Sequence, residues 1–195
     1  MFSAINASVN RCGRFTADEL DLFNSLLVPK TVRKRQVLLR EGEICDFEAY
    51  IVRGCLRTYY IDESGSEVIL QFAVEDWWVS DVCSFHERTP SQLYIDAVED
   101  SELFTLNPER KERLLAAVPQ FERVFRLMLQ RHVGALEQRL IRTMAKPAEA
   151  RYLDFIRRYP QIAARVPQQD IAAYLGMTPE FLSKIRRRLA QRKDW

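Results

Sequence analysis

Apolar and polar positions follow successive patterns along the chain. Over residues 14–29 apolar side chains recur every three or four positions, which predicts a helix with Thr16 as its cap and Pro29 beyond its end. From residue 31 to residue 106 the pattern changes to short runs rich in β-branched and aromatic residues, separated by turn residues. The predicted strands cover 37–39, 49–52, 56–61, 68–74, 93–98 and 103–106. Short strands at near-regular spacing predict a small antiparallel roll or barrel.

Helical spacing returns after residue 106. Asn107 is a candidate cap with Pro108 at the first helical position, and a long helix is expected to follow Pro119 and to run to about Met144. Its apolar stripe consists of Phe121, Phe125, Met128, Leu136 and Leu140. A helix of this length without a breaker can pair with its copy in a second chain. The alternative is an amphipathic helix that lies on its own domain.

The last fifty residues predict a helix-turn-helix. A helix over 146–160 has an apolar face, and a shorter helix over 167–175 follows it and ends at Gly176, a residue that readily adopts positive φ. Thr178 is the expected cap of the next helix and Pro179 its first residue. The apolar face of the 146–160 helix consists of Tyr152, Leu153, Phe155 and Ile156. A helix, a glycine turn and a capped helix in this order are typical of the helix-turn-helix motif.

The second helix of this motif has two faces. Leu182, Ile185 and Leu189 form a stripe that is expected to be buried, and the opposite face is polar and basic. The first turn of a recognition helix points into the major groove, so the predicted contacts with base edges are made by Pro179, Glu180, Ser183 and Lys184. The predicted contacts with DNA phosphates are made by Gln168, Thr178, Arg186, Arg187, Arg188 and Arg192. The alternative is a solvated basic face on a small helical subdomain.

The distribution of charge supports the DNA-binding interpretation. The whole chain carries a net charge of only +2. Residues 146–195 contain eleven Lys or Arg and five Asp or Glu, whereas the other 145 residues contain 18 basic and 22 acidic side chains. Positive charge is therefore concentrated in the segment that is predicted to neutralise phosphates.

Composition restricts the class of protein. With 47% hydrophobic and 29% charged residues, the 195-residue chain is typical of folded globular proteins. Its apolar runs are too short to span a bilayer, and its N-terminus lacks a secretory signal, so no membrane contact and a cytoplasmic location are expected.

The cysteines and histidines do not predict a metal site. Cys12, Cys45, Cys55 and Cys83 are spread without a C-x-x-C pair, and His86 and His132 stand alone. We expect reduced, partly buried thiols and neither a metal nor a cofactor, with a redox-sensing thiol as the alternative.

The helix-turn-helix segment resembles the Crp/Fnr family of bacterial regulators. The family pattern Q-x-x-I-A-x-x-L-G-x-x-x-E-x-x-S-R is similar to QQDIAAYLGMTPEFLSKIRRRL in this chain. A weaker resemblance lies in the glycine-punctuated stretch REGEICDFEAYIVRGCLRTYY, and together the two cover almost the whole chain.

This resemblance implies an α+β fold with three parts. They are an antiparallel β-roll of the double-stranded β-helix type with flanking helices (1–118), a long dimerisation helix (119–145) and a helix-turn-helix DNA-binding domain (146–195). The implied function is that of a transcriptional regulator that binds double-stranded DNA as a homodimer on a near-palindromic operator. RNA polymerase and a small-molecule effector of unknown identity are further partners that the resemblance allows.

The effector cassette departs from the family pattern. In members that bind cyclic AMP or cyclic GMP, a Gly-Glu pair starts a small helix and a later Arg neutralises the cyclic phosphate together with backbone amides. Here Ser80 and Asp81 replace the Gly-Glu pair, Ser91 stands at the position of the Arg, and Arg88 is three residues early. With Tyr94, these residues form a degenerate cassette, and we expect cyclic AMP not to bind with physiological affinity.

Two further features differ from other family members. The chain ends at Trp195, five residues beyond Ala190, so a β-hairpin wing after the recognition helix is not expected and the helices themselves must supply phosphate contacts. Cys12 stands alone at the N-terminus, so the iron–sulfur sensing of some members is not expected either.

Two other classes of function compete with this interpretation. The chain could be a ligand-sensing module whose C-terminal helices bind a protein partner. It could also be a metal enzyme of the cupin type, but the roll has a single histidine, His86, and the chain lacks a catalytic triad pattern, so no enzymatic activity is expected. Four aromatic residues near the cassette either line an effector pocket or belong to the core: Trp77, Trp78, Phe85 and Tyr94.

Overall fold

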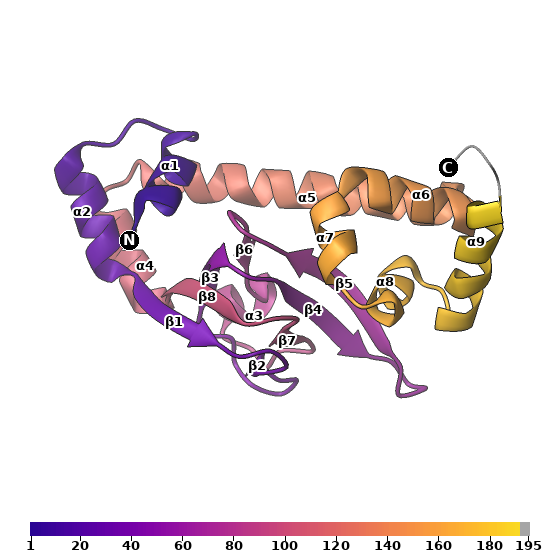
Figure 1. Ribbon diagram of the computed structural model, residues 1–195. Coiled ribbons are helices and arrows are strands. Elements are labelled where there is room, and N and C mark those ends of the chain that lie inside the picture. The colour runs from indigo at the N-terminus through magenta and orange to yellow at the C-terminus, as the bar shows by residue number, and fades with distance from the viewer. Residues whose placement is uncertain (192–195) are drawn as a thin grey trace.

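The computed structural model describes residues 1–191 and has an α+β fold. Two short N-terminal helices precede a β-roll, a long helix runs beside the roll, and four shorter helices follow at its far end (Figure 1). The α+β fold that the resemblance implied is therefore confirmed. Arg192 and the expected absence of a wing after Ala190 lie outside the described residues.

The N-terminal helices are α1 (Ser3–Asn10), which was not predicted, and α2 (Ala17–Leu26). The Thr16 hydroxyl accepts a hydrogen bond from the Glu19 N–H at 3.3 Å, and the Glu19 carboxylate accepts one from the Thr16 N–H at 2.7 Å, so the expected cap is a complete capping box. The helix ends earlier than expected because Pro29 lies in β1 (Val28–Val32). β1 is an edge strand, where a residue without an N–H is tolerated.

The roll consists of two four-stranded antiparallel sheets, with strand orders β1-β8-β3-β6 and β2-β7-β4-β5. The further strands are β2 (Val37–Leu39), β3 (Glu48–Arg53), β4 (Leu56–Ile61), β5 (Glu67–Ala73), β6 (Trp78–Val79), β7 (Tyr94–Ala97) and β8 (Ser101–Leu106). All six predicted strands are present. Two further strands were not predicted: β1, which contains a proline, and β6, which has only two residues. The short helix α3 (Val82–Glu87), between β6 and β7, was also missed.

Apolar side chains from both sheets fill the roll. Leu39, Ile51, Leu56, Ile95 and Leu103 are among the fully buried members of this core. The turn between β3 and β4 requires Gly54, whose φ is +117° and whose added Cβ would lie 2.1 Å from the Ser101 Oγ.

The long helix α5 (Phe121–Ala145) follows α4 (Pro108–Ala117), which Asn107 caps as expected by accepting a hydrogen bond from the Arg110 N–H at 2.9 Å. The expected apolar stripe of α5 divides into two parts. Phe121 is buried in a cluster with the N-terminal helices, and Phe125 and Met128 pack against that cluster. The side chains of Leu136 and Leu140 are exposed.

The C-terminal helices are α6 (Ala148–Arg158), α7 (Pro160–Arg165), α8 (Gln168–Leu175) and α9 (Pro179–Gln191). α7 was not predicted as a separate helix; Pro160 is its first residue. One apolar cluster joins these helices to the roll, with Ile69 and Phe72 of β5 on one side and Phe155, Ile171 and Leu175 on the other. Among the described residues, the helices are too short or too polar to cross a bilayer.

Candidate nucleic-acid interface

The turn between α8 and α9 has the geometry that its sequence predicts. Gly176 adopts φ +64° at the end of α8, and the Met177 N–H donates a hydrogen bond to the Ala172 carbonyl at 2.9 Å. The Thr178 hydroxyl accepts a hydrogen bond from the Phe181 N–H at 3.2 Å and so caps α9. Only Met177 and Thr178 therefore separate Gly176 from the first residue of α9.

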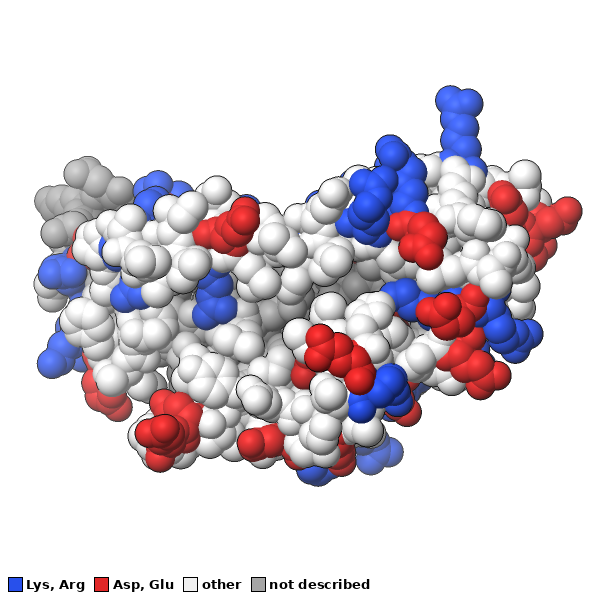
Figure 2. Space-filling model, turned by 180° about the vertical axis from the view of Figure 1, so that it is seen from behind, with Lys and Arg blue, Asp and Glu red and all other residues white. Residues whose placement is uncertain are grey.

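The two faces of α9 differ as expected. Leu182, Ile185 and Leu189 are buried against the other C-terminal helices. The predicted base-reading and phosphate-contacting residues within the described range are all exposed: Gln168, Thr178, Pro179, Glu180, Ser183, Lys184, Arg186, Arg187 and Arg188. Lys and Arg side chains predominate at the end of the molecule that carries α9 on the face shown in Figure 2.

The charged side chains of α9 are not equivalent. The exposed Glu180 carboxylate accepts hydrogen bonds from the Glu180 backbone and from the Thr178 side chain. These bonds, together with the nearby Lys184 ammonium, lower the pKa of Glu180. Arg188 forms an ion pair with Glu149 of α6, so its guanidinium is engaged within the helical domain. Neither Arg186 nor Arg187 forms an ion pair with another residue of the described range 1–191.

The first helix of the motif, α8, is fixed to the roll by a buried ion-pair network. Arg57 of β4 donates two hydrogen bonds to Asp96, at 2.8 and 3.0 Å, and two to Glu67, at 2.6 and 3.3 Å. Its Nη1 also lies 3.5 Å from the Asp170 Oδ1 in α8. Burial raises the pKa of Asp170, while the Arg57 charge opposes that shift.

A second charged contact joins α7 to the roll. Arg165 donates two hydrogen bonds to the Glu75 carboxylate, at 2.7 and 2.9 Å, and also contacts Glu99. These bonds lower the pKa of Glu75 to about 2. No local pattern in the sequence marks Arg57 or Arg165, because their partners are far away along the chain.

The degenerate effector cassette is satisfied by hydrogen bonds within the protein. Asp81 caps α3 by accepting a bond from the Ser84 N–H at 3.2 Å, and the buried Ser91 hydroxyl donates to the other Asp81 oxygen at 2.6 Å. The Ser80 hydroxyl donates to the Phe47 carbonyl at 2.9 Å. Arg88, with φ +55°, donates to the Cys45 carbonyl at 2.7 Å.

The four aromatic residues near the cassette pack against several apolar clusters. Phe85 is buried in the core of the roll, Trp78 packs on Tyr50 with the N-terminal cluster, and Trp77 lies against Tyr159 of the helical domain. The Tyr94 ring stacks on the Tyr59 ring at a centroid distance of 5.2 Å. Trp77 also packs against the roll core that contains Phe85, and with Tyr94 it packs against the cluster of the helical domain. These contacts favour the alternative that the four rings belong to the core.

The thiols agree with the expectation of small buried side chains at three positions. Cys12, Cys45 and Cys55 are buried, whereas Cys83 is exposed, and all four are free. Burial raises the pKa of the Cys55 thiol to about 12, which makes it unreactive near neutral pH. Within residues 1–191, no group of three or more Cys, His, Asp or Glu side chains is arranged to hold a metal ion.

Comparisons with known proteins agree with this architecture. Residues 29–117 match the family model "Cyclic nucleotide-binding domain". The "Anaerobic regulatory protein" of Pasteurella multocida is 25% identical over 91% of this chain and 70% of its own length. The "Transcriptional activator protein Anr" of Pseudomonas protegens is 24% identical over 83% of this chain and 70% of its own length. These relatives are named as regulators, in agreement with the expectation that the chain is not an enzyme.

Solved structures share the fold. FixK2 from Bradyrhizobium japonicum is similar with a TM-score of 0.75 and 19% identity, covering 85% of each chain. A Crp/Fnr-family regulator from Eubacterium rectale is similar with a TM-score of 0.73 and 16% identity, covering 90% of this chain and 84% of its own. Residues 29–117 therefore match a cyclic nucleotide-binding domain, and in its order of roll, long helix and helix-turn-helix the whole chain is similar to transcriptional regulators of the Crp/Fnr family.

Proposed function

We propose that the protein binds a near-palindromic DNA operator as a homodimer, with α9 as the recognition helix in the major groove. The observation that carries this proposal is the exposed face of α9, where Lys184, Arg186 and Arg187 stand opposite the buried Leu182 and Ile185. Ser183 and Lys184 lie in the first turns of the helix, as base-reading side chains do in other helix-turn-helix proteins. Such a regulator acts in the cytoplasm, with RNA polymerase as a further partner if it activates transcription.

The proposed dimer forms through the long helix of residues 119–145, between a sensor part (1–118) and a DNA-binding part (146–195). Six large apolar side chains of α5 are exposed, and four of them recur at alternating spacings of four, three and four residues: Leu129, Val133, Leu136 and Leu140. This is the spacing of a coiled-coil seam, and pairing with a second copy would remove these side chains from water.

We further propose that cyclic AMP is not the effector. The groups that would have to receive a cyclic phosphate already have hydrogen-bond partners within the protein, since Asp81 accepts from Ser91 and Arg88 donates to the Cys45 carbonyl. A negatively charged phosphate beside Asp81 would also meet a carboxylate without a compensating arginine. Calorimetry of the purified protein with cyclic AMP should detect no binding; a dissociation constant in the low micromolar range would contradict this.

Selection of bound sequences from a random DNA pool, followed by mobility shifts, tests the DNA-binding function. We expect a near-palindromic site whose half-sites are about one helical turn, ~34 Å, apart, and an affinity that falls steeply with salt. Equal affinity for selected and random DNA would favour the alternative, in which the C-terminal helices bind a protein partner.

A further inference from the structure

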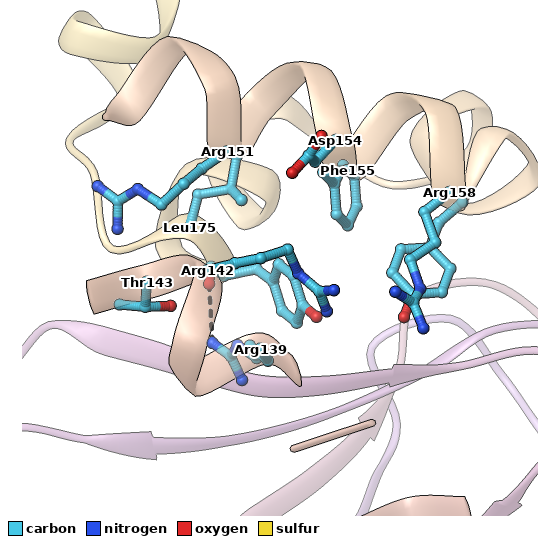
Figure 3. Close-up of a pocket in the computed structure, with 10 residues that line it drawn as sticks. Arg139, Arg142, Thr143, Arg151, Asp154, Phe155, Arg158 and Leu175 are labelled. Carbon is cyan, nitrogen blue, oxygen red and sulfur yellow. Dashed lines mark hydrogen bonds between the residues drawn. The ribbon is translucent and has the colours of Figure 1, made fainter. Parts of the chain in front are cut away.

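A pocket lies where the end of α5 meets α6 and α8, away from the cassette of the roll (Figure 3). Four arginines line it, Arg139 and Arg142 from α5 and Arg151 and Arg158 from α6. The lining contains one carboxylate, Asp154, which forms an ion pair with Lys146. Among the described residues, none of the four guanidinium groups forms an ion pair, although Asp154 lies near enough to Arg142 for their charges to interact, so four cations face one carboxylate and the pocket carries net positive charge.

Arg139 is the most constrained of these cations. It donates hydrogen bonds to the carbonyls of Ile69 at 2.8 Å and Tyr174 at 2.7 Å and also bonds to that of Leu70, and its guanidinium lies 4.1 Å from the centre of the Tyr174 ring. Carbonyl oxygens satisfy its N–H groups but bring no net charge. A partly buried cation without a counter-ion is costly, and an anion in the pocket would compensate it.

The other arginines offer free donors. The Nε of Arg151 is buried and has no hydrogen-bond partner within the part of the chain that the structure describes. Figure 3 shows the guanidinium groups of Arg142 and Arg158 directed into the space beside Phe155, whereas the end of Arg151 points away from it. Two converging guanidinium groups match the geometry of a phosphate, sulfonate or carboxylate group.

A second, apolar pocket continues the first. The two share Arg139, Phe155, Tyr159 and Tyr174 in their linings, so they adjoin. The second is lined mostly by apolar and aromatic side chains, among them Phe72, Trp77 and Ile162, together with the polar Gln71 and His132. We refer to these two adjoining pockets as the groove, with a cationic end at Arg142 and Arg158 and an apolar end at Trp77 and Ile162.

We propose that this groove binds a small amphipathic anion. Arg142 and Arg158 hold its phosphate, sulfonate or carboxylate group, and its aromatic or aliphatic body lies on the side of Trp77 and Ile162. The proposal does not depend on operator recognition. Because α5, α6 and α8 all line the groove, an occupant would join the long helix to the helix-turn-helix.

Calorimetry of the full-length protein with 1-naphthyl phosphate, without DNA, tests the proposal. We expect saturable binding of one molecule per chain. Inorganic phosphate, which lacks the apolar body, and 1-naphthylmethanol, which lacks the charge, should each bind at least about tenfold more weakly. Equal affinity for 1-naphthyl phosphate and inorganic phosphate, or no saturation, would overturn the proposal.

Two variants locate the anionic group. Arg142→Gln and Arg158→Gln should each weaken binding of 1-naphthyl phosphate at least about tenfold, because each removes a charge-assisted hydrogen bond. Arg157→Gln is the matched control: it removes the same charge from an exposed neighbour that does not line the pocket, and affinity should stay unchanged. Thermal melts verify that the variants are folded. If Arg142→Gln unfolds, Arg158→Gln still tests the proposal, because Arg158 is exposed and its replacement should not unfold the protein.

The remaining outcomes separate this site from DNA binding. An equal loss of affinity in all three variants would indicate non-specific attraction and overturn the proposal. Variants that bind DNA more weakly but 1-naphthyl phosphate normally would assign Arg142 and Arg158 to DNA phosphates and would also overturn it. Failure of the protein to recognise any operator would leave the calorimetric result, and therefore the proposal, unaffected.

Discussion

The Arg57 guanidinium in the roll and the Asp170 carboxylate in α8 face each other at 3.5 Å and are both largely buried, with 14% and 10% of their side chains exposed. This contact joins the roll to α8, the first helix of the helix-turn-helix. Asp96 gives Arg57 a bidentate partner, whereas Asp170 makes a longer contact and has a pKa raised by burial.

We predict that the two carboxylates respond differently to removal of their charge. Asp96→Asn breaks the bidentate pair of a buried cation and should destabilise the protein by roughly 2–3 kcal/mol. Asp170→Asn should leave stability unchanged or raise it by up to about 1 kcal/mol at pH 7, because a raised pKa means that ionisation costs more in the folded state. Urea denaturation measures both; a larger loss for Asp170→Asn would contradict the prediction.

The contact between Arg165 and Glu75 should make stability depend on acid pH. Since folding lowers the pKa of Glu75 from 4.5 to about 2, its contribution is complete above pH 4.5 and is lost as the pH falls toward 2. Glu75 is 42% exposed, so solvent screening limits the effect to about 1 kcal/mol. Glu75→Gln should reduce the change in the free energy of unfolding between pH 4.5 and pH 2. Glu63→Gln, a control in the β4–β5 loop, should leave that change as it is. The same pH dependence in both variants would argue against a stabilising contact between Arg165 and Glu75.

Lys184→Ala and Arg187→Ala should affect DNA binding in different ways. Loss of a base contact at Lys184 should relax selectivity at one position of the half-site and cost about 1–3 kcal/mol there. Loss of a phosphate contact at Arg187 should weaken binding evenly across sequences and reduce the salt dependence. Arg14→Ala, exposed at the opposite end of the molecule, is the control, and mobility shifts with selected and scrambled sites measure all three.

A charge in the exposed stripe of α5 should weaken the dimer. Leu140 is 60% exposed in the single chain, and Leu140→Lys places two like charges in the proposed seam. We expect the dissociation constant from sedimentation equilibrium to rise at least about tenfold. Gln138→Lys adds the same charge at another exposed position of α5 and should leave the dimer intact; equal effects of both would place the interface elsewhere.

Gly176 should not tolerate a side chain. Its φ of +64° disfavours residues with a Cβ, so Gly176→Ala should cost about 1 kcal/mol although no atom lies within 4 Å of the added Cβ. Gly134→Ala, in the helical conformation of α5 and equally uncrowded, should instead stabilise by roughly 0.5–1 kcal/mol. Thermal melts that shift in the same direction for both would contradict the assignment of strain to the turn.

The sequence by itself determined the elements that depend on interactions between neighbouring residues, such as helix caps and amphipathic helix faces. Thr16, Asn107 and Thr178 each accept a hydrogen bond from an amide three residues ahead, and such caps can be read from neighbouring residues alone. The apolar stripe of Leu182, Ile185 and Leu189 follows from helical periodicity in the same way. The strands β1 and β6 were not predicted, because a proline in β1 and the two-residue length of β6 remove the local signal of a strand.

Tertiary structure alone decided how these elements meet. Arg57 and Asp170, or Arg165 and Glu75, are about a hundred residues apart, and nothing near either residue indicates its partner. The groove at Arg142 and Arg158 likewise exists only where α5, α6 and α8 converge. The periodicity of a segment reports which of its faces is buried but not which element covers that face. The amino-acid sequence therefore predicted the two faces of α9, and only the folded chain revealed the ion pairs that join α7 and α8 to the roll and the groove between α5, α6 and α8.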